Sequence, residues 1–330
     1  MKFFSQLTLF CFFAILTTAG RGAENPNIGQ DAPDLNLDGW ATSKTLQQNA
    51  LDGRPYALEF WATWCPPCRQ SIPHLNELSQ RMEPFGLRVL GLSEEGLDKV
   101  EPFATEMGMT YYVGAGHEMS GLKFDGIPFA AAVGADGKIE WAGHPMDAAF
   151  EKTLWKLTRD YAPQTLLPAI EKAEGGALGP AYETLQGIDT EQAKASMKRM
   201  RSNLDLRLEQ AGTLDGLERY HALSDIQQLY EGVPGTGEVA NRMAALMQNP
   251  DIKKAVEQER PIRELEGKVE AVRAKAMKMQ EKKSREQVMA YYFKELISIF
   301  ESFVDEHPDH PETPQIRQAL EQFRAQAETE

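Results

Sequence analysis

Cys65 and Cys68 are the residues of this sequence best suited to chemistry. Two thiols three residues apart lie on one turn of a helix and can close a reversible disulfide. An apolar run at residues 56–62 precedes them, and a helical pattern begins at Pro66. The pattern therefore predicts a helix N-terminus at the cysteines, where partial positive charge and unpaired N–H groups favour a thiolate. The chemistry expected of such a pair is thiol–disulfide exchange.

The cysteine count favours redox chemistry over a metal site. The chain has three cysteines, and Cys11 lies in an N-terminal segment that we expect to be removed. Structural zinc requires four ligands, the sequence holds no second Cys-x-x-Cys, and its six histidines show no ligand spacing. We therefore predict no metal. A purely structural disulfide is disfavoured, because a bridge between near neighbours closes a small loop and stabilises little.

The N-terminus has the pattern of a secretory signal peptide. Lys2 supplies the positive charge, residues 7–19 are apolar, and small residues follow. We assign residues 1–23 to this segment, with cleavage after Ala19 or Gly20. The apolar run is short for a membrane span, although an uncleaved anchor is the alternative. The sequence thus predicts export to the periplasm or another extracytoplasmic compartment.

Length and charge set the outline of the protein. A chain of 330 residues suggests two domains, and a formal net charge of −14 argues against nucleic acid as a partner. The composition changes near Pro163, so we predict a redox domain at 24–162 that folds alone and a helical domain at 163–330. Within the first domain we expect strands at 56–62, 87–92, 129–133 and 138–141, and helices at 66–82, 97–107 and 147–161.

The second half reads as all-helical. Apolar residues recur in steps of three and four along two seams that are separated by a polar stretch at 281–286. The first seam comprises Ile262, Leu265, Val269, Val272, Ala276 and Met279, and the second Met289, Phe293, Leu296, Phe300 and Phe303. Seams this short favour packing inside a bundle over a coiled-coil dimer. A weak repeat of residues 229–234 at 303–308 resembles tetratricopeptide-type hairpins, with incomplete signature residues.

Several motifs of the first domain resemble one family in order and spacing. They resemble the thioredoxin superfamily and, within it, the TlpA/ResA-like exported disulfide reductases. The matching segments are residues 29–35, the active-site segment 60–68, Pro73, Gly126-Ile127-Pro128 and Asp136-Gly137-Lys138. The resemblance covers residues 28–160. It implies an α/β thioredoxin fold, with a central mixed sheet flanked by helices.

The resemblance also implies roles for the matching residues. Cys65 is the nucleophile and Cys68 the resolving thiol, so the redox-active disulfide Cys65–Cys68 takes the place of a cofactor. Pro128, if its peptide bond is cis, shapes the groove for a partner strand. The residues expected to contact the client are Trp64, Pro66, Pro67 and Ile127. Trp61 either flanks the same groove or packs in the core.

Two positions refine the family pattern. Glu59 lies mid-strand, six residues before Cys65, where thioredoxin has a buried acid. If it is buried, desolvation raises its pKa and it can exchange a proton with Cys68; the alternative is an edge residue in solvent. ResA-like proteins often carry a Glu three residues after the second cysteine, whereas this chain has Ser71.

The function predicted from these features is reduction of disulfides in exported client proteins. Candidate clients are apocytochrome c, metallochaperones or misoxidised proteins, with a membrane thiol–disulfide protein as electron donor. The same fold also hosts oxidases and isomerases. A further alternative is an envelope scaffold whose helical half is the working part. Peroxidase activity is excluded because Thr63 and Cys65 are one residue closer than the Thr-x-x-Cys of peroxiredoxins.

Overall fold

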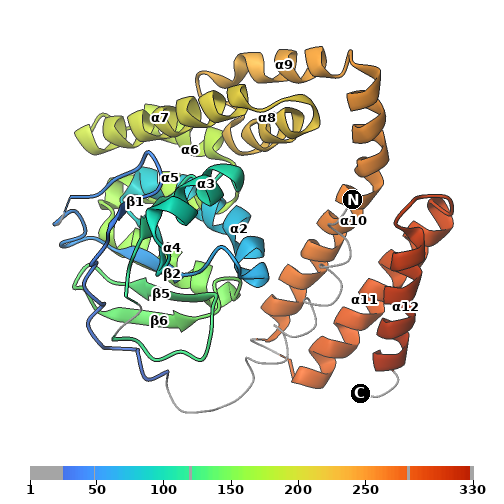
Figure 1. Ribbon diagram of the computed structural model, residues 1–330, viewed down its shortest axis with the longest axis horizontal. Helices are drawn as coiled ribbons and strands as arrows, with labels where there is room; N and C mark the ends of the chain where they lie inside the picture. Colours follow the sequence, from blue (N-terminus) through green and yellow to red (C-terminus); the bar gives the residue numbers. More distant parts are fainter. Residues whose placement is uncertain (1–24, 48, 119–120, 281–282, 328–330) are drawn as a thin grey trace. The chain divides into compact units, whose positions relative to one another are not determined.

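The computed structural model describes residues 25–47, 49–118, 121–280 and 283–327 (Figure 1). The predicted signal peptide at residues 1–23 lies outside these ranges. The chain forms two compact units, Ala23–Leu246 and Met247–Glu330. Among the helices described, none is both long enough and apolar enough to cross a bilayer.

The first unit contains a mixed sheet in the order β1-β4-β3-β2-β5-β6. The strands are β1 (Gly39–Trp40), β2 (Tyr56–Phe60), β3 (Arg88–Ser93), β4 (Tyr112–Ala115), β5 (Phe129–Val133) and β6 (Ile139–Gly143). The central strands β2, β3 and β4 are parallel to one another. Strand β5 is antiparallel to β2, and β6 is antiparallel to β5. This is the mixed sheet of a thioredoxin fold, as predicted. Strands β1 and β4, which are the shortest, were not expected from the sequence.

Strand β2 holds the start of the active-site segment in a fixed position. It is paired on both edges and wholly buried. Because side chains alternate along a strand, Leu58 and Phe60 pack in the core on one face of the sheet, while Ala57 packs in the core on the other. Glu59 therefore points to the face of Ala57, which is the face covered by helices.

Three helices pack on that face within the predicted redox domain. They are α2 (Pro66–Met82), α3 (Leu97–Glu106) and α4 (Ala148–Tyr161). Helix α2 buries Ile72, Leu75 and Leu78, which recur at helical spacing as expected. The predicted bounds of all three helices agree with the observed ones to within one residue.

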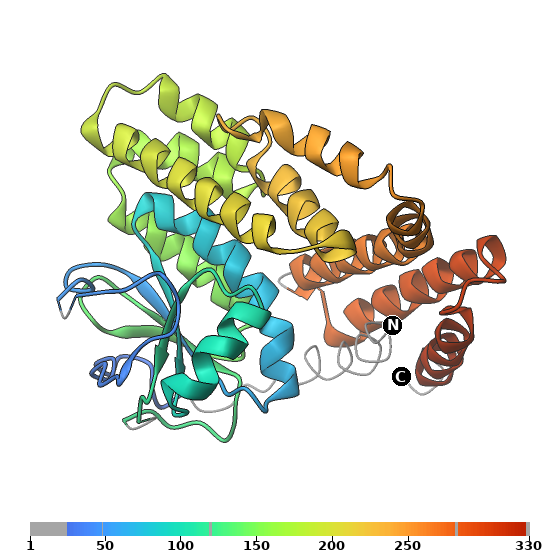
Figure 2. The same ribbon diagram turned by 45° about the horizontal axis from the view of Figure 1, so that its top comes forward.

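The boundary between the two units differs from the predicted one at Pro163. Five further helices continue the core of the sheet: α5 (Leu167–Glu174), α6 (Leu178–Gln186), α7 (Glu191–Thr213), α8 (Gly216–Tyr230) and α9 (Val239–Leu246). Figures 1 and 2 both show α7 and α8 side by side. The compositional change at Pro163 marks a change of secondary structure, and the division between compact units comes after Leu246.

Hydrogen bonds tie the last turns of α2 and the turn after it to these added helices. Arg81 Nε donates to the carbonyl oxygen of Ala173 at 3.0 Å. Tyr230 Oη donates to Gln80 Oε1 at 3.2 Å. Ser196 Oγ donates to the carbonyl oxygen of Pro84 at 2.9 Å. Since these side chains are buried, the contacts help to fix the helix that carries both cysteines.

The second unit has a core of its own. It comprises α10 (Pro250–Gln280), α11 (Arg285–Glu306) and α12 (Thr313–Ala327), with α11 packed on both other helices. Residues of both predicted seams lie in one hydrophobic cluster, which agrees with packing inside a bundle. Ser284 caps α11 with a capping box after the polar stretch. The pairs α8–α9 and α11–α12 are helical hairpins, and their likeness to tetratricopeptide repeats stays a weak resemblance.

Candidate active site

Cys65 is the N-cap residue of α2, as the sequence predicts. Its backbone is extended, with φ −92° and ψ 102°, and its Sγ accepts a hydrogen bond from the N–H of Cys68 at 3.3 Å. Pro66 and Pro67 occupy the first helical positions, where a missing N–H costs little. A sulfur at this position lies close to the positive end of the helix dipole, which stabilises a thiolate.

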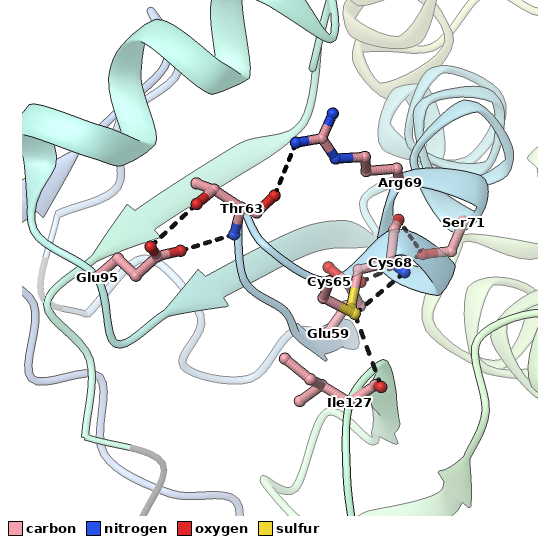
Figure 3. The surroundings of a disulfide bond; sticks show 8 residues. All are labelled: Glu59, Thr63, Cys65, Cys68, Arg69, Ser71, Glu95 and Ile127. Atoms are coloured by element: carbon pink, nitrogen blue, oxygen red, sulfur yellow. Dashed lines mark hydrogen bonds between the residues drawn. A yellow bond between two sulfur atoms is a disulfide. The ribbon is translucent and has the colours of Figure 1, made fainter.

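The two cysteines form a disulfide with an S–S distance of 2.03 Å. Both are buried, with Cys65 2% and Cys68 0% exposed. Cys65 Sγ lies 3.7 Å from the carbonyl oxygen of Ile127. Figure 3 marks this contact with a dashed line. The Ile127–Pro128 peptide bond is cis. The loop that carries it faces the sulfur of Cys65 through the carbonyl of Ile127.

The residues predicted to contact a client differ in how far they are exposed to solvent. Trp64 is 69% exposed, which makes it one of two large apolar side chains that the described residues leave open to solvent. Pro66 is exposed, whereas Pro67 and Ile127 are half-buried. An exposed indole next to a nearly buried sulfur gives a partner chain an apolar contact at the site of exchange.

Trp61 does not flank this surface. Its side chain is fully buried and packs against Phe103 of α3, with ring centroids 5.3 Å apart. The core-packing alternative is therefore the correct one for Trp61. The reason is its position directly after β2, where alternation places the indole on the helix-covered face together with Glu59.

Glu59 lies at the centre of the sheet and is 0% exposed. Ser71 Oγ is 3.3 Å from Glu59 Oε1 and donates to the carbonyl oxygen of Cys68 at 2.9 Å. Burial raises the pKa of Glu59 to about 8, against the lowering effect of the Ser71 hydroxyl. The carboxyl beside the disulfide is thus mostly protonated at neutral pH, and the solvent-exposed alternative for Glu59 is excluded.

Two charged residues that were not expected from the sequence hold the active-site loop. Glu95 accepts hydrogen bonds from the N–H of Thr63 at 2.6 Å and from its Oγ1 at 3.0 Å. Arg69 donates to the carbonyl oxygen of Thr63 at 3.0 Å (Figure 3). Its guanidinium lies over the ring of Phe103. Both backbone groups of Thr63, two residues before Cys65, are therefore fixed by side chains. The sequence does contain a signal for this contact. Glu95 follows β3 and Thr63 follows β2, and the carboxyl ends of neighbouring parallel strands lie at the same edge of the sheet.

The described residues contain no group of three or more His, Cys, Asp or Glu side chains placed to hold a metal ion. The chemistry that the site offers is carried by the cysteine pair, the cis-proline loop and one buried acid. Together with the mixed sheet, this defines a thioredoxin-fold protein with a disulfide at the N-terminus of α2.

Comparison with known proteins identifies the family to which the chain belongs within this fold. Residues 28–124 match the AhpC/TSA family. The chain is 30% identical over 184 residues to the thiol:disulfide interchange protein DsbE of Yersinia pestis, which covers 52% of this chain and 90% of that protein. It is 29% identical over 123 residues to the thiol-disulfide oxidoreductase ResA of Bacillus thuringiensis, covering 35% of this chain and 69% of that one. The chain belongs to the DsbE/ResA family of thiol–disulfide oxidoreductases, which confirms the resemblance.

Solved structures also resemble the chain. A thiol-disulfide isomerase from Corynebacterium glutamicum aligns with 21% identity and a TM-score of 0.33, covering 38% of this chain and 96% of that one. A thioredoxin-family thiol:disulfide interchange protein from Chlorobium tepidum aligns with 23% identity and a TM-score of 0.33, covering 41% and 99%.

Proposed function

We propose that this protein reduces disulfide bonds in exported client proteins. The proposal is carried by two observations. Cys65 lies at a helix N-terminus beside an exposed Trp64, and the buried acid Glu59 contacts Ser71, whose hydroxyl donates to the carbonyl oxygen of Cys68. This arrangement gives the two sulfurs different tasks. Cys65 forms the mixed disulfide with the client, and Cys68 resolves this mixed disulfide from inside the protein.

The reaction follows from ordinary thiol–disulfide exchange. In the dithiol form, the Cys65 thiolate attacks one sulfur of a client disulfide, and the other client sulfur leaves as a thiolate. Cys68 then loses its proton and attacks Cys65 Sγ, which forms the Cys65–Cys68 disulfide and releases the second client thiolate. The client gains two electrons and the cysteine pair loses two. A membrane thiol–disulfide protein is the proposed donor that restores the dithiol.

Glu59 exchanges the proton of Cys68 in this scheme. With the disulfide closed, the raised pKa keeps the carboxyl protonated at neutral pH. When a donor opens the disulfide, Cys68 leaves as a thiolate and takes this proton. The resulting carboxylate is then the base that accepts the proton again when Cys68 attacks the mixed disulfide.

Insulin reduction by dithiothreitol, followed by turbidity, tests the activity. We expect the protein to accelerate it and Cys65→Ser to abolish the acceleration. A Cys65→Ser variant that works as well as the parent would overturn the proposal. Direction is tested by equilibration with glutathione: a reductant has a potential nearer that of thioredoxin, about −270 mV, than that of DsbA, about −120 mV. A value above about −150 mV would favour an oxidase instead.

We propose that the protein is exported, because Lys2 and the apolar run at residues 7–19 have the pattern of a signal peptide. N-terminal sequencing of the mature protein tests it. A first residue of Gly20 or Arg21 supports cleavage at the predicted sites, whereas a retained Met1 in a membrane fraction supports the uncleaved anchor. The candidate clients are apocytochrome c thiols, metallochaperone thiols and misoxidised proteins. Identifying the proteins that form a mixed disulfide with Cys65 distinguishes among them.

A further inference from the structure

Asn27 is a fully buried polar side chain that the redox scheme does not use. Its Nδ2 donates to the carbonyl oxygen of Lys123 at 2.7 Å, and its Oδ1 accepts from the N–H of Lys123 at 2.8 Å. One side-chain amide thus pairs with both backbone groups of a residue 96 positions further along the chain. Because the amide lies out of reach of water, Lys123 is the partner that satisfies it.

Lys123 belongs to the loop that leads to Ile127 and Pro128. Over residues 121–128, Lys123 is the residue whose backbone N–H and carbonyl are hydrogen-bonded to another described part of the chain. Phe124 adds an apolar contact, since its ring stacks on that of Phe129 with centroids 4.6 Å apart. The two hydrogen bonds to Asn27 therefore hold this loop by its backbone.

Asn27 is itself fixed to the sheet. Its N–H donates to Asn25 Oδ1 at 3.0 Å, and Asn25 Nδ2 donates to the carbonyl oxygen of Ala142 in β6 at 3.0 Å. Two backbone hydrogen bonds join residues 29–30 to Ile139 of the same strand. The segment that carries Asn27 therefore lies along β6, and Asn27 connects this strand to the loop.

The loop lies where a client must pass. In the mixed disulfide the client sulfur is bonded to Cys65 Sγ, which lies 3.7 Å from the carbonyl oxygen of Ile127. Within the described residues, the N–H of Ile127 has no hydrogen-bond partner, and its carbonyl oxygen faces a sulfur that carries no proton in the disulfide. Both groups are therefore open to backbone hydrogen bonds from an extended peptide segment.

We propose that Asn27 is a positioning residue for the client, which holds the loop in the conformation in which Ile127 pairs with the peptide segment beside the client cysteine. A loop that is already ordered binds without the cost of ordering it. Asn27 takes no part in the transfer of electrons or protons, so its effect is confined to disulfides that carry a peptide backbone. The inference rests on the proposed function and adds this selectivity to it.

Asn76 offers a matched control. It is also buried, its Nδ2 donates to the carbonyl oxygen of Gly108 at 3.0 Å, and its Oδ1 accepts from the N–H of Thr110 at 2.7 Å. These loop residues precede β4, which is parallel to β2, so they lie at the end of the sheet opposite to the active-site segment. Asn76→Ala thus removes the same kind of contacts from a loop that does not face Cys65.

The test compares two disulfides in single-turnover reactions with the reduced full chain, stopped by thiol alkylation. One is the disulfide-linked dimer of a short peptide with a central cysteine, and the other is 2-hydroxyethyl disulfide, which has no peptide backbone. We expect Asn27→Ala to lower the rate constant for the peptide about threefold to tenfold, which corresponds to about one hydrogen bond, and that for the small disulfide by less than about twofold. Asn76→Ala should change neither rate constant, although both variants should lower the midpoint of urea unfolding.

Asn27→Asp has the shape of the parent side chain and keeps the oxygen that accepts from Lys123, so it serves if Asn27→Ala does not fold. It should show the same selective loss to a smaller degree. Equal losses for the two disulfides, no loss for the peptide, or the same selective loss in Asn76→Ala would overturn the inference and leave the reductase proposal standing. A parent that reduces neither disulfide would overturn both.

Discussion

Ser71 Oγ lies 3.3 Å from Glu59 Oε1, so the residue that departs from the ResA-like pattern is the one that contacts the buried acid. A Glu at position 71 would place a second carboxyl against Glu59 in a buried site, where two like charges cannot both ionise. This chain has the acid on the strand and a hydroxyl on the helix.

Replacing Cys68 should trap clients. Cys68→Ala leaves Cys65 able to form a mixed disulfide but removes the thiol that resolves it. We expect stable disulfide-linked adducts that disappear with reductant, measured by non-reducing electrophoresis and mass spectrometry. The double variant Cys65→Ser/Cys68→Ala is the control. Adducts that persist in the double variant would show that another group captures the clients.

Glu59→Gln should remove a pH dependence of stability. The folded pKa of about 8 is above the ordinary value of 4.5, so the unfolded state ionises first. Between these two pH values the folded state holds one more proton, and the free energy of unfolding falls by up to about 1.4 kcal/mol per pH unit as pH rises. Urea unfolding at several pH values measures this. Identical profiles for parent and variant would contradict a buried, titrating Glu59.

The same substitution should slow one kinetic step selectively. Without the carboxylate, Cys68 loses its proton more slowly, so resolution of the mixed disulfide should slow more than its formation. Stopped-flow mixing with a small disulfide substrate separates the two steps. Glu95→Gln is the matched control, because Glu95 contacts Thr63 but not the cysteine helix. An equal effect on both steps would favour a structural role for Glu59.

The position of the unit boundary predicts how fragments behave. Residues 24–246 should fold cooperatively and keep insulin reductase activity, because the whole first core is present. Residues 24–162 should be unfolded or much less stable, since Arg81 and Gln80 would lose their buried partners Ala173 and Tyr230. Urea unfolding followed by circular dichroism measures both. Equal unfolding midpoints for the two fragments would instead support a domain boundary at Pro163.

Glu83 should stabilise the first unit in the opposite pH direction from Glu59. Burial alone would raise its pKa, but Lys44, Tyr112 and Arg88 outweigh burial and lower it. The stability that Glu83 supplies is therefore present above pH 4.5 and is lost as pH falls through the lowered folded pKa.

Glu83→Gln should cost about 1–3 kcal/mol at pH 7 and progressively less in acid. Denaturant unfolding at pH 7 and pH 3 tests this. Glu77→Gln, at a half-exposed ion pair with Arg81, is the control and should change stability by less than about 1 kcal/mol. A constant difference between parent and Glu83→Gln across pH would contradict the lowered pKa.

The sequence by itself determined the features that depend on local pattern. Cys65 as an N-cap residue, the bounds of α2 and the helical seams of the second unit follow from short-range spacing, because helix caps and amphipathic faces are set by residues a few positions apart. Family motifs added the cis-proline loop opposite Cys65.

Only the tertiary structure decided which distant residues meet. Glu95 reaches Thr63 across two strands whose pairing no local pattern encodes. Helices α5–α9 join the core of the sheet although their composition resembles that of α10–α12. The physical reason is that an amphipathic helix specifies that one face must be buried, whereas the surface that buries it is chosen by the packing of the whole chain.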